Sequence, residues 1–352
     1  MAASPRRKKT ARFGDIAALA GVSPSTVDRV LNERGSVSSR ARAKVVAAAK
    51  ELAIPRVLPE MRHGLIHLDI LLPNNASPFF RRLNQALQRA IPLLNKRFVV
   101  HRKSFPEQDE AAMIRAVLAP PYPRQGLIIA APDTPLMRGA LREALARGEH
   151  VAMVVTNVAG LERARYVGID NYAAGRTAGY LLGRFCHQPG RVLLLSSRAD
   201  YRGHIERATG CAEVLGEAFG HLRCERLMEQ TSDDPDRCYI AVSEAFRRGG
   251  PIAGIYNTGA GSPGIEAALR RFADRDKVCW VAHELSDDHR QYLLGGILDV
   301  VIDQDPDGQA TMALQHVLTA PGVTEASAGG AGPGEFRLYL PENMRKESYI
   351  AV

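Results

Sequence analysis

Hydrophobic and polar positions follow two different patterns along this chain, one in the first sixty residues and another in the rest. In the first part, apolar residues recur at three- and four-residue spacing, as on one face of a helix. A short amphipathic helix over residues 15–20 is predicted from this spacing in Phe13, Ile16, Ala17, Leu19 and Ala20.

A second helix follows after a short turn. Gly21 is typical of a helix stop, and Ser23 followed by Pro24 is typical of an N-cap and a first helical residue. The spacing predicts a helix over residues 24–31, with Val27, Val30 and Leu31 facing inward and Ser25, Thr26, Asp28 and Arg29 facing outward. Two helices joined by so short a turn indicate helix-turn-helix geometry.

A third helix completes this small unit. Ser38 is placed to cap it, and its apolar stripe consists of Val45, Ala48, Ala49 and Leu52. Three helices of this length enclose one small core.

Beyond residue 63 the pattern changes to short apolar runs alternating with helical stretches. The strand-like runs are 65–72, 98–101, 126–130, 150–155, 191–195, 252–256 and 278–282, with a last strand at 336–340. The helix-like stretches include 79–93, 136–147, 173–185 and 263–272. Repeated strand–helix units indicate parallel sheets covered on both faces. The predicted fold class is therefore a small all-α helix-turn-helix head and an α/β body of two doubly wound parallel sheets.

Charge separates the same two parts. Residues 1–62 contain 13 Lys and Arg against 5 Asp and Glu, so they hold the entire formal net charge of +8, and the other 290 residues are neutral. A small basic unit joined to a neutral body indicates a head that binds a polyanion such as DNA. A solubilising basic tail is the alternative interpretation on charge alone.

Several function classes are disfavoured. No apolar run is long enough for a membrane span, and the basic start lacks the apolar core of a signal peptide, so we expect a cytoplasmic protein without membrane contact. The five cysteines contain no C-x-x-C pair, and no zinc-like spacing or catalytic motif is found. We therefore expect no metal, no cofactor and no enzymatic activity.

The predicted second helix has the side chains that reading DNA requires. In helix-turn-helix motifs its N-terminal end enters the major groove, where Arg29 could hold guanine by two hydrogen bonds and Ser25 and Thr26 could reach bases or phosphates. We expect phosphate contacts from Arg12, Ser23 and Asn32. Pro24 completes the predicted DNA-binding set.

The string from Arg12 to Asn32, R-F-G-D-I-A-A-L-A-G-V-S-P-S-T-V-D-R-V-L-N, closely resembles the opening of LacI-type transcription regulators. It departs from that family at Asp28, where Ser is usual. The family's hinge sequence A-R-x-L is also missing, although Leu58 or Met61 could still act as the apolar wedge in the minor groove. The predicted organisation is a basic tail at 1–10, a helix-turn-helix domain at 11–54, a hinge at 55–63 and an effector-binding and dimerisation domain at 64–352.

The body offers polar groups where a ligand would be expected. Ligands of open parallel sheets bind beyond the carboxyl ends of the strands, and amide, carboxylate, guanidinium and aromatic groups follow several predicted strands. Such groups suit a sugar, a polyol or a related small polar ligand. Arg202 and Arg207 keep acidic and phosphorylated ligands open as well.

LacI-type bodies are similar to periplasmic sugar-binding proteins, with two lobes and a ligand between them. Residues 75–80 resemble their first-strand loop, 167–179 their first crossing and 300–308 another crossing. The resemblance places ligand contacts at Phe79, Phe80, Asn157, Arg207, Asn257, Glu284 and Gln304. Glu284 replaces the usual Asp.

Two other functions compete. Gly259, Gly261 and Gly264 form a literal G-x-G-x-x-G after a predicted strand, with Glu284 twenty residues after Gly264, as in NAD-dependent oxidoreductases. A free sugar-binding protein is the other alternative, although it leaves the basic head unexplained.

The function predicted from the sequence is a DNA-binding transcription regulator controlled by a small sugar or polyol, and most often a repressor in the resembled family. The resemblance implies a homodimer on a near-palindromic double-stranded operator. The end of the chain shows no leucine heptad, so a tetramer through a terminal coiled coil is not expected.

Overall fold

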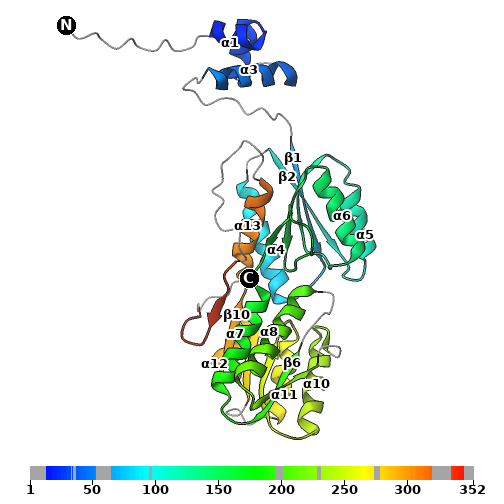
Figure 1. The fold of residues 1–352 in the computed structure, drawn as a ribbon, viewed down its shortest axis with the longest axis vertical. Coiled ribbons are helices and arrows are strands. Elements are labelled where there is room, and N and C mark those ends of the chain that lie inside the picture. Colours follow the sequence, from blue (N-terminus) through cyan, green and yellow to red (C-terminus); the bar gives the residue numbers. More distant parts are fainter. Residues whose placement is uncertain are drawn as a thin grey trace, which may run out of the picture. The chain divides into compact units, whose positions relative to one another are not determined.

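The computed structural model describes residues 13–32, 34, 37–52, 65–94, 97–195, 201–227, 231–272, 278–318 and 334–344. The chain divides into two compact units, residues 1–65 and 66–352, drawn in Figure 1. Arg12, Leu58 and Met61 lie outside the described residues.

The first unit contains three helices, α1 (Phe13–Ala20), α2 (Pro24–Leu31) and α3 (Ser39–Glu51). Gly21 takes a left-handed φ of +62° where α1 ends, a conformation that glycine adopts without strain. The core is built from Ile16, Ala17, Ala20, Val27, Val30, Leu31, Val45, Val46, Ala48 and Ala49. Phe13 and Leu19 are 38% and 47% exposed, so part of the apolar pattern that predicted α1 faces outward.

The first sheet of the second unit is entirely parallel, with strand order β2-β1-β3-β4-β5. Its strands are β1 (Ile66–Pro73), β2 (Phe98–Phe105), β3 (Arg124–Ile129), β4 (His150–Val154) and β5 (Arg165–Val167). One face is covered by α4 (Pro78–Ala90) and α13 (Pro306–Leu318), and the other by α5 (Glu110–Leu118) and α6 (Pro135–Ala146). The 3₁₀ turn η1 (Ile91–Leu93) follows α4.

The second sheet has the order β11-β10-β9-β8-β6-β7, and only β11 runs antiparallel to its neighbour. Its strands are β6 (Gly190–Leu195), β7 (Leu222–Arg226), β8 (Ile252–Asn257), β9 (Cys279–His283), β10 (Val300–Asp303) and β11 (Arg337–Tyr339). The helices α7 (Asn171–Phe185) and α8 (Arg202–Ala218) cover one face. The helices α10 (Pro235–Arg247), α11 (Ser262–Phe272) and α12 (Asp287–Leu294) lie on the other.

The two sheets define two lobes, and the chain passes between them three times. The first passage joins β5 to α7, the second joins β10 to α13, and the third lies between α13 and β11. The predicted pair of doubly wound parallel sheets is thereby confirmed. The strand predicted at 98–101 continues to Phe105, because β2 is an edge strand whose exposed side carries polar residues.

Close helix packing positions one predicted ligand residue. A Cβ at Gly175 of α7 would lie 2.1 Å from the carbonyl oxygen of Arg207 in α8, so only glycine permits this approach. The contact holds the start of α8 against α7 and brings the Arg207 side chain to the carboxyl end of the second sheet.

No helix in the described part of the chain is both long and apolar enough to cross a membrane.

Candidate functional site

The exposed end of α2 is built by its N-cap. Ser23 Oγ accepts a hydrogen bond from the Thr26 amide at 3.2 Å, and Pro24 occupies the first turn, where its missing N–H costs no hydrogen bond. Ser25 and Arg29 are exposed, and Thr26 is half-buried. Ser25 and Thr26 lie in the first turn of α2, and Arg29 lies in its last turn, three and four residues further on, so that these side chains share one side of the helix. Asn32 is the C-cap of α2.

Asn32, a predicted phosphate contact, is hydrogen-bonded to Asp28 in the same helix. Its Nδ2 donates to Asp28 Oδ1 at 2.5 Å, which directs the amide toward a carboxylate on the same helix. A carboxylate repels phosphate, so Asp28 opposes the attraction that the surrounding cations exert.

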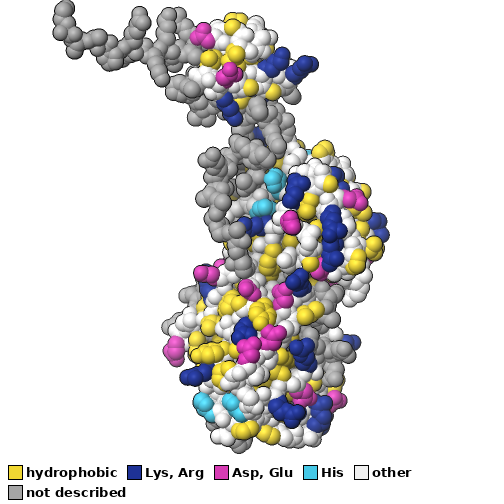
Figure 2. Space-filling view, viewed as in Figure 1, with side chains coloured by type: hydrophobic (Ala, Val, Ile, Leu, Met, Phe, Trp, Pro, Cys, Tyr) yellow, Lys and Arg dark blue, Asp and Glu magenta, His cyan; other side chains and the backbone are white. Residues whose placement is uncertain are grey.

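Cations outnumber anions at the exterior of the described head, where Asp15 and Glu51 are the exposed carboxylates. Figure 2 shows Lys and Arg side chains at its exterior, and the exposed cations of the described residues are Arg29, Arg34, Arg40, Lys44 and Lys50. Such a distribution is typical of a surface that binds a polyanion.

The second unit contains a cavity of about 520 Å³ at the carboxyl ends of strands from both sheets. The first lobe contributes the loop and helix start at 74–81, Glu107 and Val155. The second lobe contributes Tyr201, Gly203, His204, Arg207, Asp233, Pro235, residues 258–263, His283, Glu284, Ser286, Asp288, His289 and Gln304. A volume of this size suits a small-molecule ligand.

Five of the seven predicted ligand residues line this cavity, namely Phe79, Phe80, Arg207, Glu284 and Gln304. Asn257 does not line it. Its Nδ2 lies 3.0 Å from the carbonyl oxygens of Gly259 and Ala260 and donates to them, so Asn257 shapes the loop that forms the wall.

Asn157 lies elsewhere. It lines a second cavity of about 470 Å³ beside the first passage between the lobes, together with residues such as Tyr166 and Asn171. The strand-end rule placed Asn157 at the correct edge of the sheet but not in the main cavity.

Arg207 is buried and bonded on three sides. Its Nε donates to Asn171 Oδ1 at 2.9 Å, one terminal nitrogen donates to the Thr258 carbonyl at 2.8 Å, and the other donates to Gln304 Oε1. These bonds fix the guanidinium in the wall and leave few of its N–H groups for a ligand.

Glu284 is the buried carboxyl group of the cavity wall. Its Oε1 accepts from Gln304 Nε2 at 2.5 Å, whereas its Oε2 accepts no hydrogen bond from the described residues. Burial, reinforced by the nearby Asp303 carboxylate and opposed by Arg82 and Arg207, raises the pKa of Glu284 to about 8. Its backbone has a φ of +69°, a strained conformation for a non-glycine residue.

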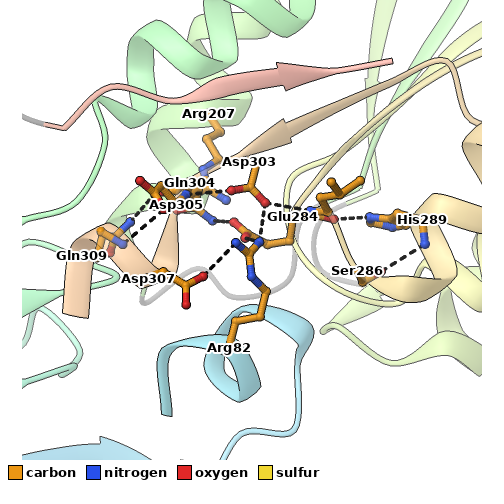
Figure 3. A network of polar contacts seen from close by, with 12 residues as sticks. Arg82, Arg207, Glu284, Ser286, His289, Asp303, Gln304, Asp305, Asp307 and Gln309 are labelled. Carbon is orange, nitrogen blue, oxygen red and sulfur yellow. Dashed lines mark hydrogen bonds and ion pairs between the residues drawn. The ribbon is translucent and has the colours of Figure 1, made fainter. Parts of the chain in front are cut away.

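Arg82 of α4 lies behind Glu284 and is 3% exposed (Figure 3). Its NH1 contacts Asp303 and lies 3.6 Å from Glu284 Oε2, and its NH2 lies 3.2 Å from Asp307. Burial alone would lower the pKa of Arg82, but Asp303 and Glu284 raise it above its ordinary value. Arg82 was not among the residues predicted from the sequence; the available signal was an arginine directly before Leu83 in the buried stripe of α4.

Two histidines of the wall, His283 and His289, are buried. Burial lowers the pKa of His283 well below its usual value and also lowers that of His289. His289 Nδ1 donates to the Glu284 carbonyl at 2.5 Å, and its Nε2 accepts from Ser262 Oγ at 2.6 Å. These bonds tie the loop after β9 to the start of α11.

The glycine-rich run serves packing between helices. A Cβ at Gly264 would lie 1.7 Å from the Pro235 carbonyl oxygen, and one at Gly261 would lie 2.4 Å from Cys238 Sγ. Both glycines therefore have a structural reason that involves no dinucleotide. Among the described residues, no group of three His, Cys, Asp or Glu side chains is arranged to hold a metal ion.

Comparison with known families assigns both parts of the chain. Residues 13–54 match "Bacterial regulatory proteins, lacI family", and residues 68–320 match "Periplasmic binding protein domain". The resemblance read from the sequence is confirmed for both parts.

Two curated relatives are operon repressors. The sucrose operon repressor of Pediococcus pentosaceus is 29% identical over 113 residues, which is 31% of this chain and 34% of the relative. The ribose operon repressor of Halalkalibacterium halodurans is 40% identical over 79 residues, 21% of this chain and 23% of the relative. The chain thus spans about a third of the first relative and about a quarter of the second.

Solved structures share the fold of the body. A solute-binding protein from Burkholderia graminis in complex with D-arabinose aligns with a TM-score of 0.70 at 18% identity, covering 82% of this chain and 99% of that one. A solute-binding protein from Bacillus halodurans with bound myo-inositol also has a TM-score of 0.70, at 15% identity, covering 80% and 96%. The chain belongs to the periplasmic binding protein domain family through residues 68–320, and it joins this domain to a head of the bacterial lacI regulatory family at residues 13–54.

Proposed function

We propose that this protein is a DNA-binding transcription regulator, acting as a repressor, whose operator affinity is set by a small ligand in the cavity. The observation that carries the proposal is the pairing, in one chain, of a basic helix-turn-helix head with a two-lobed body that encloses a polar cavity. A role on the chromosome places the protein in the cytoplasm.

On DNA, the exposed end of α2 enters the major groove. Arg29 donates two hydrogen bonds to guanine, Ser25 and Thr26 contact bases or phosphates, and Ser23 and Pro24 lie against the backbone. The family match of the head supports this docking. Arg12 and a hinge wedge at Leu58 or Met61 remain part of the proposal.

Two copies of the chain pair through their bodies, which places two heads on a near-palindromic operator. Half-sites of helix-turn-helix dimers lie about one helical turn apart, so the symmetry of the operator follows that of the protein.

The ligand is an uncharged polyol or sugar. Arg202, which could have favoured an acidic ligand, pairs with Glu206 at 2.6 Å and does not line the cavity. Arg207 is largely occupied by protein acceptors. The carboxyl group of Glu284 and the rings of Phe79 and Phe80 instead suit hydroxyl groups and the apolar face of a sugar.

The experiment has two steps, both with the full chain. Selection from random duplexes would first identify an operator, which we expect to be near-palindromic. A thermal-shift series with D-ribose, D-arabinose, sucrose, myo-inositol, D-gluconate and D-ribose 5-phosphate would then identify the ligand class. Stabilisation by the last two alone would contradict an uncharged ligand, and failure to enrich any duplex would contradict DNA binding.

A further inference from the structure

Arg82 belongs to the first lobe and contacts Asp303 and Glu284 of the second lobe (Figure 3). It extends from α4, which packs against the first sheet and against α13. Its partners Asp303 and Glu284 lie at the ends of β10 and β9 in the second sheet. One guanidinium therefore bridges the two lobes directly behind the cavity wall.

Arg82 alone does not satisfy all the carboxyl groups of the cluster formed by Glu284, Asp303 and Asp307. Asp303 Oδ2 is already shared with the Leu285 amide at 3.0 Å, and Asp307 is also held by the exposed Arg89 at 2.6 Å. Glu284 is the member whose remaining oxygen accepts no hydrogen bond from the described residues and which also lines the cavity. A ligand that contacts the Glu284 carboxyl group from the cavity therefore changes the competition for Arg82.

We propose that Arg82 is the positioning residue through which occupancy of the cavity fixes the angle between the two lobes. A ligand hydroxyl that donates to the Glu284 carboxyl group favours the ionised carboxylate, and this carboxylate then holds the guanidinium of α4 more strongly. A contact between one ligand group and the second lobe therefore strengthens the interaction between the two lobes. The inference rests on the proposed function of the cavity as the effector site.

The alternative is that Arg82 only neutralises a buried acidic cluster. Loss of the cation would then lower stability without changing the lobe angle, since breaking a buried ion pair is destabilising whatever its role. The deciding measurement must therefore report the lobe angle and not stability alone.

The distance between the lobes can be measured in the full chain without any ligand. Nitroxide labels on cysteines placed at Glu143 of α6 and Glu244 of α10, both exposed, report one lobe each. The half-buried Cys224 and Cys279 would be replaced by alanine, and the labelled chain would be diluted with unlabelled chain so that distances within one chain dominate.

We expect a broader or displaced distance distribution in Arg82→Met than in the parent chain. Arg82→Lys keeps the charge but lacks the planar fork, so it should shift the distribution less. Arg89→Met is the matched control, because Arg89 lies on the same helix but is 57% exposed, and it should leave the distribution unchanged. An Arg82→Met distribution that superimposes on that of the parent overturns the proposal.

Arg82→Met leaves buried carboxylates without their cation and could fail to fold. Arg82→Met combined with Asp303→Asn removes both members of the pair and is the more tolerable variant. This double variant still lacks the Arg82 guanidinium between the lobes and should show the same change in lobe distance as Arg82→Met.

A second experiment tests whether the contact made by Arg82 affects regulation. For whichever of D-ribose, D-arabinose or myo-inositol stabilises the parent chain, the ratio of operator affinities with and without the sugar should fall toward one in Arg82→Met, from the roughly 5- to 150-fold typical of allosteric coupling. If the parent chain binds neither sugar nor operator, the proposed function fails, and the distance measurement still decides the role of Arg82.

Discussion

The guanidinium of Arg82 lies 3.6 Å from Glu284 Oε2, although the two residues belong to different lobes and both are almost completely buried. Glu284 lines the cavity and also lies against this cation. The protonation state of Glu284 therefore affects the cavity, the contact between the lobes and the stability of the body.

The raised pKa of Glu284 predicts a specific pH dependence of stability. The folded chain keeps this proton up to pH about 8, whereas the unfolded chain releases it near the ordinary value of about 4.5. Because the folded pKa is the higher one, this contribution to the free energy of unfolding is complete below the unfolded pKa and decreases as pH rises toward 8.

Glu284→Gln removes that dependence, since glutamine is uncharged throughout. The variant should therefore gain stability relative to the parent chain as pH increases from 5.5 to 8.5. Urea midpoints of both chains at the two pH values test this, and the buried histidines cancel because both chains contain them. Parallel pH profiles would show that Glu284 titrates normally.

The packing of α7 on α8 predicts opposite effects for two glycine substitutions. Gly175→Ala would place a Cβ 2.1 Å from the Arg207 carbonyl oxygen, and overpacking of this kind costs about 1 to 3 kcal/mol. Gly216→Ala, in α8, meets nothing within 4 Å and should be neutral or stabilise by up to about 1 kcal/mol. Thermal unfolding of both variants checks the pair, and equal melting temperatures would contradict the close approach.

Local signals made much of this fold predictable. The Ser23-Pro24 cap predicted the first residue of α2, because capping and the fixed φ of proline act within one turn. Most of the parallel strands were predicted from apolar runs, but the short strands β5, β7 and β10 were not among the predicted runs. The exposed Phe13 and Leu19 show the limit of this reasoning, since periodicity indicates a helix but not how much of its apolar face the neighbours cover.

The cavity was predictable only in part. The strand-end rule locates residues at one edge of a sheet, which was sufficient for Arg207 and Glu284 but not for the direction in which the Asn157 and Asn257 side chains point. Arg82 could not be assigned, because its partner Asp303 lies 221 residues away along the chain. Pairings of this kind depend on tertiary packing alone.

Arg29 should determine sequence preference. Arg29→Ala is expected to weaken binding to the selected operator by about 1 to 3 kcal/mol and to relax the preference at one base pair. Fluorescence anisotropy with the operator and with single-site variants measures both effects. Lys50→Ala, an exposed cation in the last turn of α3, is the control and should leave the ratio of specific to non-specific affinity unchanged. An unchanged ratio in Arg29→Ala would reduce Arg29 to a phosphate contact.

Asp28 should limit affinity for DNA. Asp28→Ser removes a carboxylate from the basic head and frees the Asn32 amide that is bonded to it, so binding to any duplex should become tighter and its salt dependence steeper. Titrations of operator and random duplex at several salt concentrations test this. Weaker operator binding in Asp28→Ser would instead mean that the carboxylate accepts a hydrogen bond from a base such as cytosine.

Arg207 and Asn257 should affect the ligand response but not the head. Arg207→Ala removes a wall residue and three hydrogen bonds, and Asn257→Ala releases the loop at 259–262 that forms another part of the wall. Operator affinity without ligand should remain within about twofold of the parent chain, because neither residue belongs to the first unit, while the change in affinity caused by the sugar should be lost.

The two variants should differ in stability. Arg207→Ala leaves Asn171, Gln304 and the Thr258 carbonyl without a donor in a buried site, and each lost partner costs about 1 to 3 kcal/mol. Asn257→Ala loosens a loop whose helix α11 is still held by its packing on α10, so its melting temperature should fall less. Loss of operator binding in either variant, with sugar binding retained, would contradict the assignment of this cavity as the effector site.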